Sequence, residues 1–164
     1  MRTAFVVVGF FLAGSYALAH KGAAHPEAVP APAGAGALSR VNEAYKLKVR
    51  PIFFVKCFDC HGAGRPLPWY FAVPGAKQLM LYDMRTAKKH LDMRSDFPFG
   101  GHGSPLENLS AISEVVEDGS MPPWYYRIVR RGSALTPDEA AAVRAWIAEA
   151  KSSLGLEKRL SPQE

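Results

Sequence analysis

Cys57-Phe58-Asp59-Cys60-His61 is the stretch of this sequence on which its fold depends. Two cysteines three positions apart share one helical turn, so each thiol can add to one vinyl group of a porphyrin. The histidine directly after them can ligate the porphyrin iron from the proximal side. The motif therefore predicts one covalently attached haem, haem c, bound through Cys57 and Cys60, with His61 on the iron.

The other uses of such a cysteine pair fit this chain less well. Cys57 and Cys60 are its only cysteines, and a disulfide between them would close too small a loop to add much stability. A thioredoxin-like redox pair needs a βαβ context, which the sequence lacks. A structural zinc site needs four ligands, more than this pair supplies.

Length and composition predict one globular domain with appendages. The chain has 164 residues, of which 48% are hydrophobic, and a formal net charge of +5. That length is typical of a single domain, and the apolar content is enough for a core. The basic residues form no dense run and no motif interleaved with aromatics, which argues against a nucleic-acid partner.

The N-terminus is typical of a secretory signal. Arg2 precedes the apolar run 4–13, and Ala17-Leu18-Ala19 supplies small residues at both positions of a cleavage site. A membrane anchor is the alternative, but a spanning helix needs roughly 20 apolar residues, and this run is interrupted from Gly14 onward. We expect cleavage before His20, export to the periplasm and no membrane span afterwards. Export suits the motif, because bacteria attach c-type haem outside the cytoplasm.

The rest of the chain divides by composition into three parts. Residues 20–38 are rich in Ala, Pro and Gly and predict a flexible linker. The haem-binding domain is expected over residues 39–155 and a C-terminal tail over 156–164.

The hydrophobic pattern of the domain predicts an all-α fold with long loops. One helix should lead into Cys57, kinked or restarted at Pro51, because helical spacing relates Val41, Tyr45, Lys48 and Ile52. A second is expected over 77–89. Two more begin at capping boxes, Ser104 to Glu107 and Thr136 to Glu139. Gly119 should end the third, and Trp146 should lie on the apolar face of the fourth.

The second axial ligand of the iron has several candidates. Met121 lies between the helix stop at Gly119 and the pair Pro122-Pro123, which hold the loop extended. A thioether on such a stiff loop is well placed to ligate iron. Met121 could instead fill a gap in the core, as methionine often does. His90, His102 and an open coordination site remain alternatives.

The arrangement of these motifs resembles class I cytochromes c, and more closely the bacterial family of single-haem "haem-binding domain" cytochromes. That family shares three patterns, present here as Pro68-Trp69-Tyr70, Lys89-His90-Leu91 and Met121-Pro122-Pro123-Trp124. The resemblance covers about residues 39–150. It implies a cytochrome c-like fold of about four helices with long loops wrapped around one haem. In such a fold the last helix crosses the first, so Trp146 should pack near Val41 and Tyr45. By it, Cys57 and Cys60 hold the haem, and His61 and Met121 ligate the iron.

Three functions are compatible with such a haem. Electron transfer between redox partner proteins is favoured, because a His/Met pair saturates the iron and leaves no site for a substrate. A peroxidase-type enzyme would need an open coordination site. A redox or gas sensor, or an accessory haem subunit, would act through a partner. The sequence identifies neither the redox partners nor the oligomeric state.

Basic residues on both sides of the motif suggest a docking surface. If they ring the exposed edge of the haem, an acidic partner would be steered there. The alternative is an ordinary solvated helix face. These residues are Lys46, Lys48, Arg50, Lys56 and Arg65.

Overall fold

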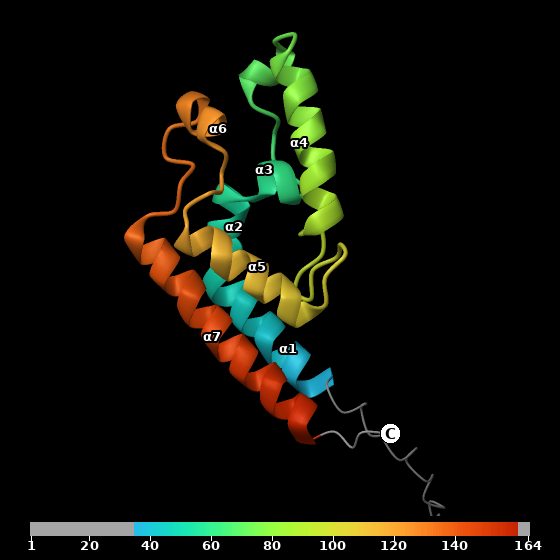
Figure 1. Ribbon diagram of the computed structural model, residues 1–164. Helices are drawn as coiled ribbons and strands as arrows, with labels where there is room; N and C mark the ends of the chain where they lie inside the picture. Colours follow the sequence, from blue (N-terminus) through green and yellow to red (C-terminus); the bar gives the residue numbers. More distant parts are fainter. Residues whose placement is uncertain (1–34, 161–164) are drawn as a thin grey trace, which may run out of the picture. The chain divides into compact units, whose positions relative to one another are not determined.

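The computed structural model of the protein describes residues 35–160, with side chains as far as residue 155 (Figure 1). These residues form helices and loops, with one isolated β-bridge between Asp92 and Gly100. The all-α prediction is therefore confirmed for this part of the chain. The predicted signal peptide 1–19 and residues 20–34 of the predicted linker lie outside it, as do residues 161–164.

The first helical run leads into the cysteine motif and changes character on the way. It comprises α1 (Ala35–Ala44), the π-helical turn η1 (Tyr45–Val49) and α2 (Arg50–Lys56). The Arg50 N–H donates to the Tyr45 carbonyl five residues back, and Pro51, which has no N–H, follows at the start of α2. A proline removes one bond of the helical ladder, and a wide turn absorbs the mismatch. The expected kink at Pro51 thus takes the form of a π-turn.

Both ends of the described domain lie further out than its composition predicts. Helix α1 begins at Ala35, inside the predicted linker, and Ala37 is fully buried. Alanine is a strong helix former, so the Ala-rich end of the linker extends the helix. At the other end, α7 (Pro137–Leu160) continues past residue 155 into the predicted tail.

The four expected helices are all found in the described residues. They are the run from α1 to α2, α4 (Ala76–His90), α5 (Pro105–Glu117) and α7. Short elements between them are α3 (Phe58–His61), the 3₁₀ turn η2 (Trp69–Ala72) and α6 (Trp124–Val129). No described helix combines the length and the apolar character needed to cross a membrane.

Both predicted capping boxes form. The Glu107 N–H donates to Ser104 Oγ over 3.4 Å, and Glu107 Oε2 accepts from the Ser104 N–H over 2.7 Å. In the second box, the Glu139 N–H donates to Thr136 Oγ1 over 3.2 Å, and Glu139 Oε2 accepts from the Thr136 N–H over 2.8 Å. After α5, Gly119 adopts a left-handed φ of 63°, the conformation that favours glycine just beyond a helix end.

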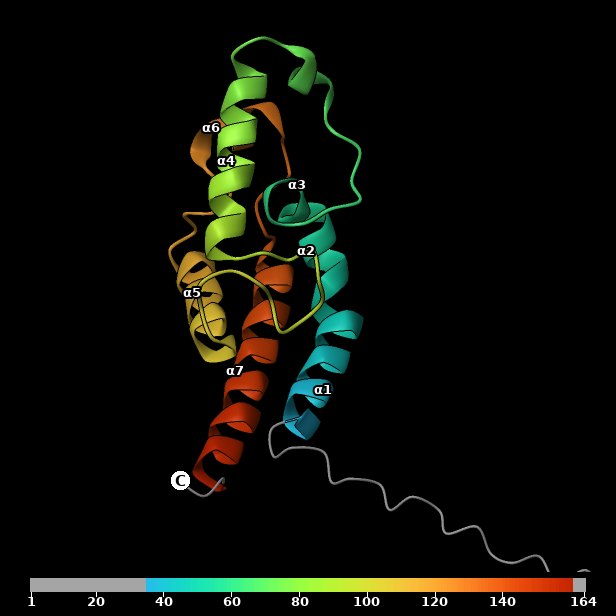
Figure 2. The same ribbon diagram turned by 90° about the vertical axis from the view of Figure 1, so that its right-hand side faces the viewer.

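The main core lies where α7 packs against α1 and η1 (Figure 2). The Trp146 indole Nε1–H donates to the Val41 carbonyl over 3.2 Å. Its ring centroid lies 5.6 Å from that of Tyr45 and 5.7 Å from that of Phe97. The prediction that Trp146 packs near Val41 and Tyr45 is confirmed. This contact fixes the helix that carries the cysteine motif.

We predict that Trp146→Ala lowers the free energy of unfolding by about 3–5 kcal/mol, because it opens a cavity and removes the hydrogen bond to the Val41 carbonyl. Denaturant unfolding of the haem-loaded protein measures this. Trp69→Ala is the matched control: Trp69 is 79% exposed, so its loss should change stability by less than about 0.5 kcal/mol. Equal effects of the two substitutions would contradict this account of the core.

Candidate functional site

The predicted site residues line one cavity of about 390 Å³ between α3, α4, α5 and the loop before α6. Cys57, Cys60, His61 and Met121 all contribute to its wall. Most of the remaining wall is apolar and includes Phe53, Leu91, Met93, Ile112 and Val116. A large apolar cavity with a few convergent polar or metal-ligating groups is typical of a cofactor site.

The cysteine turn is built as the motif predicts. The N–H groups of Cys60 and His61 both donate to the Cys57 carbonyl, over 3.2 and 3.0 Å. This single turn brings both thiols and the imidazole to the cavity wall. Gly62 ends it, and a Cβ there would overlap the Phe58 ring. The turn therefore requires glycine directly after the histidine.

The two thiols are half-buried in the cavity wall, and their surroundings disfavour the thiolate. Burial raises the pKa of Cys57 to about 12 and that of Cys60 to about 11. Reactive redox cysteines and zinc-binding cysteines have lowered pKa values instead. In addition, no cluster of three or more His, Cys, Asp and Glu side chains suited to a metal ion occurs among the described residues. The raised pKa values of the two thiols disfavour a reactive redox pair.

His61 is oriented by the chain segment that follows α4. Its Nδ1 lies 2.7 Å from the Leu91 carbonyl oxygen, which can only accept, so Nδ1 carries the proton and donates. The Met93 N–H donates to the His61 carbonyl over 2.8 Å. Burial lowers the pKa of His61 and favours the neutral ring. The Nε2 lone pair is then available to a metal, as is usual for a histidine ligand with a carbonyl partner.

Met121 lies on a loop that an arginine braces. Arg127 Nε donates to the Pro122 carbonyl over 2.6 Å, and its Nη2 donates to the Gly119 carbonyl. The prolines predicted a stiff loop, and Arg127 adds a second restraint that the sequence analysis missed. Met121 lines the cavity and is 49% exposed, so it is not a core-filling residue.

The other candidate ligands divide by position. His90 lines the cavity, whereas His102 is not part of its wall, although the two rings lie 6.3 Å apart. Met93 is buried in the main core and also reaches the cavity. Met80 instead packs in a separate cluster and Met84 lines a small pocket elsewhere. His90 therefore remains the histidine alternative to Met121.

A buried carboxylate within the motif holds distant segments together. Asp59 Oδ1 lies 2.6 Å from Arg65 Nε, and Oδ2 lies 3.1 Å from Arg130 Nη1. The Tyr126 hydroxyl also donates to Oδ2. Burial, together with this bond, raises the pKa of Tyr126. The sequence analysis missed this cluster. Its one local signal was an aspartate in an otherwise apolar turn.

The five basic residues around the motif all take part in ion pairs. Each has a carboxylate partner, and three of these five pairs link helices or loops far apart in the sequence. The pairs are Lys46–Glu43, Lys48–Glu149, Arg50–Asp96, Lys56–Glu139 and Arg65–Asp59. The sequence left a docking surface and an ordinary solvated face open, and the pairing of these charges favours the solvated face.

A family model described as "Haem-binding domain" matches residues 25–149 of the 164. The chain belongs to the haem-binding domain family. A haem in the cavity agrees with the site, which offers two thiols and an imidazole on one turn, a thioether elsewhere in the wall, and largely apolar surroundings.

The chain is also similar to a longer enzyme. It is 28% identical over 109 residues to the cytochrome c peroxidase Ccp of Escherichia coli (strain K12). The match covers 65% of this chain but only 23% of that protein, so this chain spans less than a quarter of its relative's length. No solved structure matches the chain.

We predict that Asp59→Asn lowers the free energy of unfolding by about 3 kcal/mol, because it leaves two largely buried arginines without their counter-charge. Asp96→Asn is the matched control. Asp96 pairs with Arg50 at a solvent-exposed position, and such pairs contribute about 0–1 kcal/mol. Denaturant unfolding of both haem-loaded variants makes the comparison. A smaller effect at Asp59 than at Asp96 would refute the bracing role.

Proposed function

We propose that this protein is an exported monohaem c-type cytochrome that transfers single electrons between redox proteins. Cys57 and Cys60 hold the haem covalently, and His61 and Met121 are the axial ligands. The observation that carries the proposal is the single cavity whose wall includes these four residues. The predicted signal at residues 1–19 would deliver the chain to the periplasm, where the haem is attached.

The protein's own residues position the ligands and exclude water. The Leu91 carbonyl sets the tautomer of His61, and Arg127 braces the loop of Met121. The apolar wall from α4 and α5 keeps the surroundings of the haem dry. A haem with a histidine and a methionine ligand supplies reversible one-electron chemistry at a raised potential. With both axial positions filled, no substrate would bind the iron.

A second candidate function is an accessory haem domain that supplies electrons to a peroxidase, or a haem that itself binds a small ligand. Two observations favour it. The chain is similar to a cytochrome c peroxidase, and the match covers less than a quarter of the length of that enzyme. Met121 also lies in a loop rather than in a helix, so a methionine that leaves the iron would open a coordination site for a peroxide or a gas. The methionine test below separates a closed site from an open one.

We predict that haem stays with the polypeptide after denaturation and acid–organic extraction, because two thioether bonds hold it. The intact mass of periplasmic material should equal residues 20–164 plus one haem. Cys57→Ala and Cys60→Ala should each leave at most one thioether and little mature protein. Haem that extracts completely from the wild type would rule out covalent attachment.

We predict that Met121→Ala abolishes the weak charge-transfer band that a sulfur ligand gives ferric haem at the red end of the spectrum. The wild-type ferrous protein should resist carbon monoxide, whereas the variant should bind it readily, because its sixth position is open. His102→Ala serves as the control and should change neither observation. Immediate binding of carbon monoxide by the wild type would favour the second candidate function. Loss of low-spin ligation in His90→Ala alone would identify a bis-histidine haem.

A further inference from the structure

Two segments that pack together carry only positive charge. Residues 62–82 and 119–137 contain no aspartate or glutamate. Tyr70 and Met80 of the first segment and Tyr126 of the second form a small hydrophobic cluster. The five basic residues of these segments therefore gather around one part of the domain. They are Arg65, Lys77, Arg127, Arg130 and Arg131.

Three of these five cations keep an uncompensated charge. Arg65 and Arg130 share the single carboxylate of Asp59. Arg127 binds backbone carbonyls, which carry no net charge. Lys77 and Arg131 are exposed and have no carboxylate partner among the described residues. The other basic residues near the motif differ, because each has an acidic partner of its own. They are Lys46, Lys48, Arg50 and Lys56.

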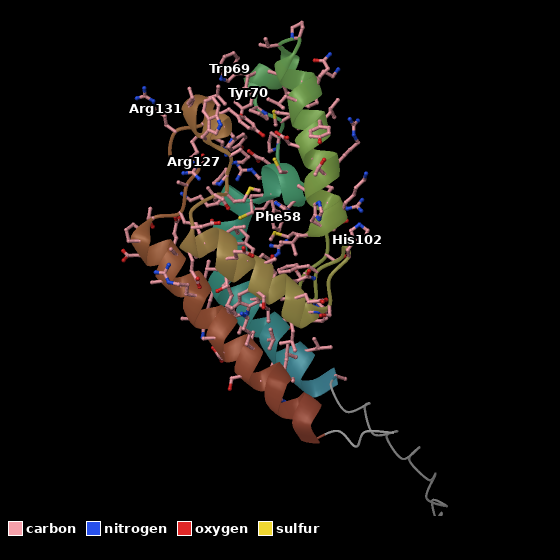
Figure 3. All side chains as sticks on the ribbon, in the orientation of Figure 1. Phe58, Trp69, Tyr70, His102, Arg127 and Arg131 are labelled. Atoms are coloured by element: carbon pink, nitrogen blue, oxygen red, sulfur yellow. The ribbon has the colours of Figure 1, made fainter. Side chains whose placement is uncertain are left out.

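Large apolar side chains are exposed on the same two segments as these cations. Trp124 and Ile128, one helical turn apart on α6, are 72% and 66% exposed, and Trp69 of η2 is 79% exposed. Figure 3 shows Trp69 and Arg131 near the same end of the domain, on η2 and in the loop after α6. Clustered apolar side chains with a charged rim are typical of interaction surfaces. We call the set Trp69, Lys77, Trp124, Arg127, Ile128 and Arg131 the cationic aromatic surface.

This surface borders the cavity. The loop that enters α6 lines the cavity through Met121, Pro122 and Pro123. On α6 itself, Tyr125 lines the cavity while its neighbour Trp124 faces solvent. A protein bound at Trp124 would contact the loop and helix that line the cavity. Electron exchange requires such a close approach to the group in the cavity.

We propose that the cationic aromatic surface docks an acidic one-electron redox protein. The inference rests on the proposed function and names the kind of partner. An occupant with acidic residues around an apolar centre complements both the three uncompensated cations and the exposed aromatic side chains. One electron passes from the reduced partner to the protein's redox group, and no atom is transferred.

The test uses the haem-loaded exported protein and a plant-type ferredoxin, a small acidic one-electron donor. The chain has three tryptophans, and their indole N–H resonances report on the two regions separately. In the ascorbate-reduced protein, oxidised ferredoxin at low salt should shift the signals of Trp69 and Trp124. The signal of Trp146, which is buried and bonded to Val41, should stay in place.

Charge reversal provides the matched comparison. Arg131→Glu should weaken the shifts and slow reduction of the ferric protein by reduced ferredoxin about tenfold at low salt, since steering by the surface is lost. Lys46→Glu makes the same change of charge at a cation that already pairs with Glu43 and should have little effect. Added salt should remove the difference between the variants.

Three outcomes would overturn the proposal. Ferredoxin could shift none of the tryptophan signals, or the two charge reversals could slow reduction equally. In the third, phosphatidylglycerol vesicles bind through Trp69 and Trp124 while ferredoxin does not. The last would make this a membrane-docking surface. Reduction by dithionite is the separate check on the proposed function. A protein with covalent haem that dithionite reduces normally but ferredoxin does not bind loses only the docking proposal.

Discussion

The tie between His61 and the segment after α4 is the constraint on which the site depends. Leu91 accepts from the imidazole and the Met93 N–H donates to the His61 carbonyl, so the two bonds hold side chain and backbone at once. Because α4 ends at His90, they also fix the wall that this helix contributes to the cavity. The Asp59 cluster acts on the other side of the same turn, where it connects the motif to Arg130, beyond α6. The motif is thus anchored to both walls of the cavity.

The sequence predicted the helices well, because capping boxes and glycine stops depend on residues that are close together in the chain. The boxes at Ser104 and Thr136 use side chains three residues away, and Gly119 adopts the backbone angle its position favours. The helical spacing of Trp146 also predicted its burial. The end of the linker was misjudged because alanine serves equally in a low-complexity linker and in a helix. Only burial of Ala37 distinguishes the two.

The sequence predicted the candidate ligands of the site but not the hydrogen bonds and ion pairs that hold them in place. Cys57, Cys60, His61 and Met121 follow from a motif and a proline-rich loop, and the cavity brings them together. Their ligation of a haem stays a prediction. The supports could not be foreseen, because Asp59 and Arg130 are far apart in the sequence, and nothing local marks Arg127 as a donor to Pro122. The same limit applies to the basic residues near the motif. The sequence does not show that Lys48 pairs with Glu149, which is about 100 residues away in the chain.

The central claim is that one haem lies in this cavity between His61 and Met121. Proton–carbon NMR of the ferrous protein, labelled with ¹³C at the methionine methyl groups, tests it most directly. The ring current of a porphyrin shifts the methyl of an axial methionine far upfield, and the chain from His20 onward has four methionines to compare. The account predicts one strongly upfield methyl signal, lost in Met121→Leu, with the other methionines near their usual positions. A spectrum without such a signal, or one in which it belongs to Met93, would contradict it.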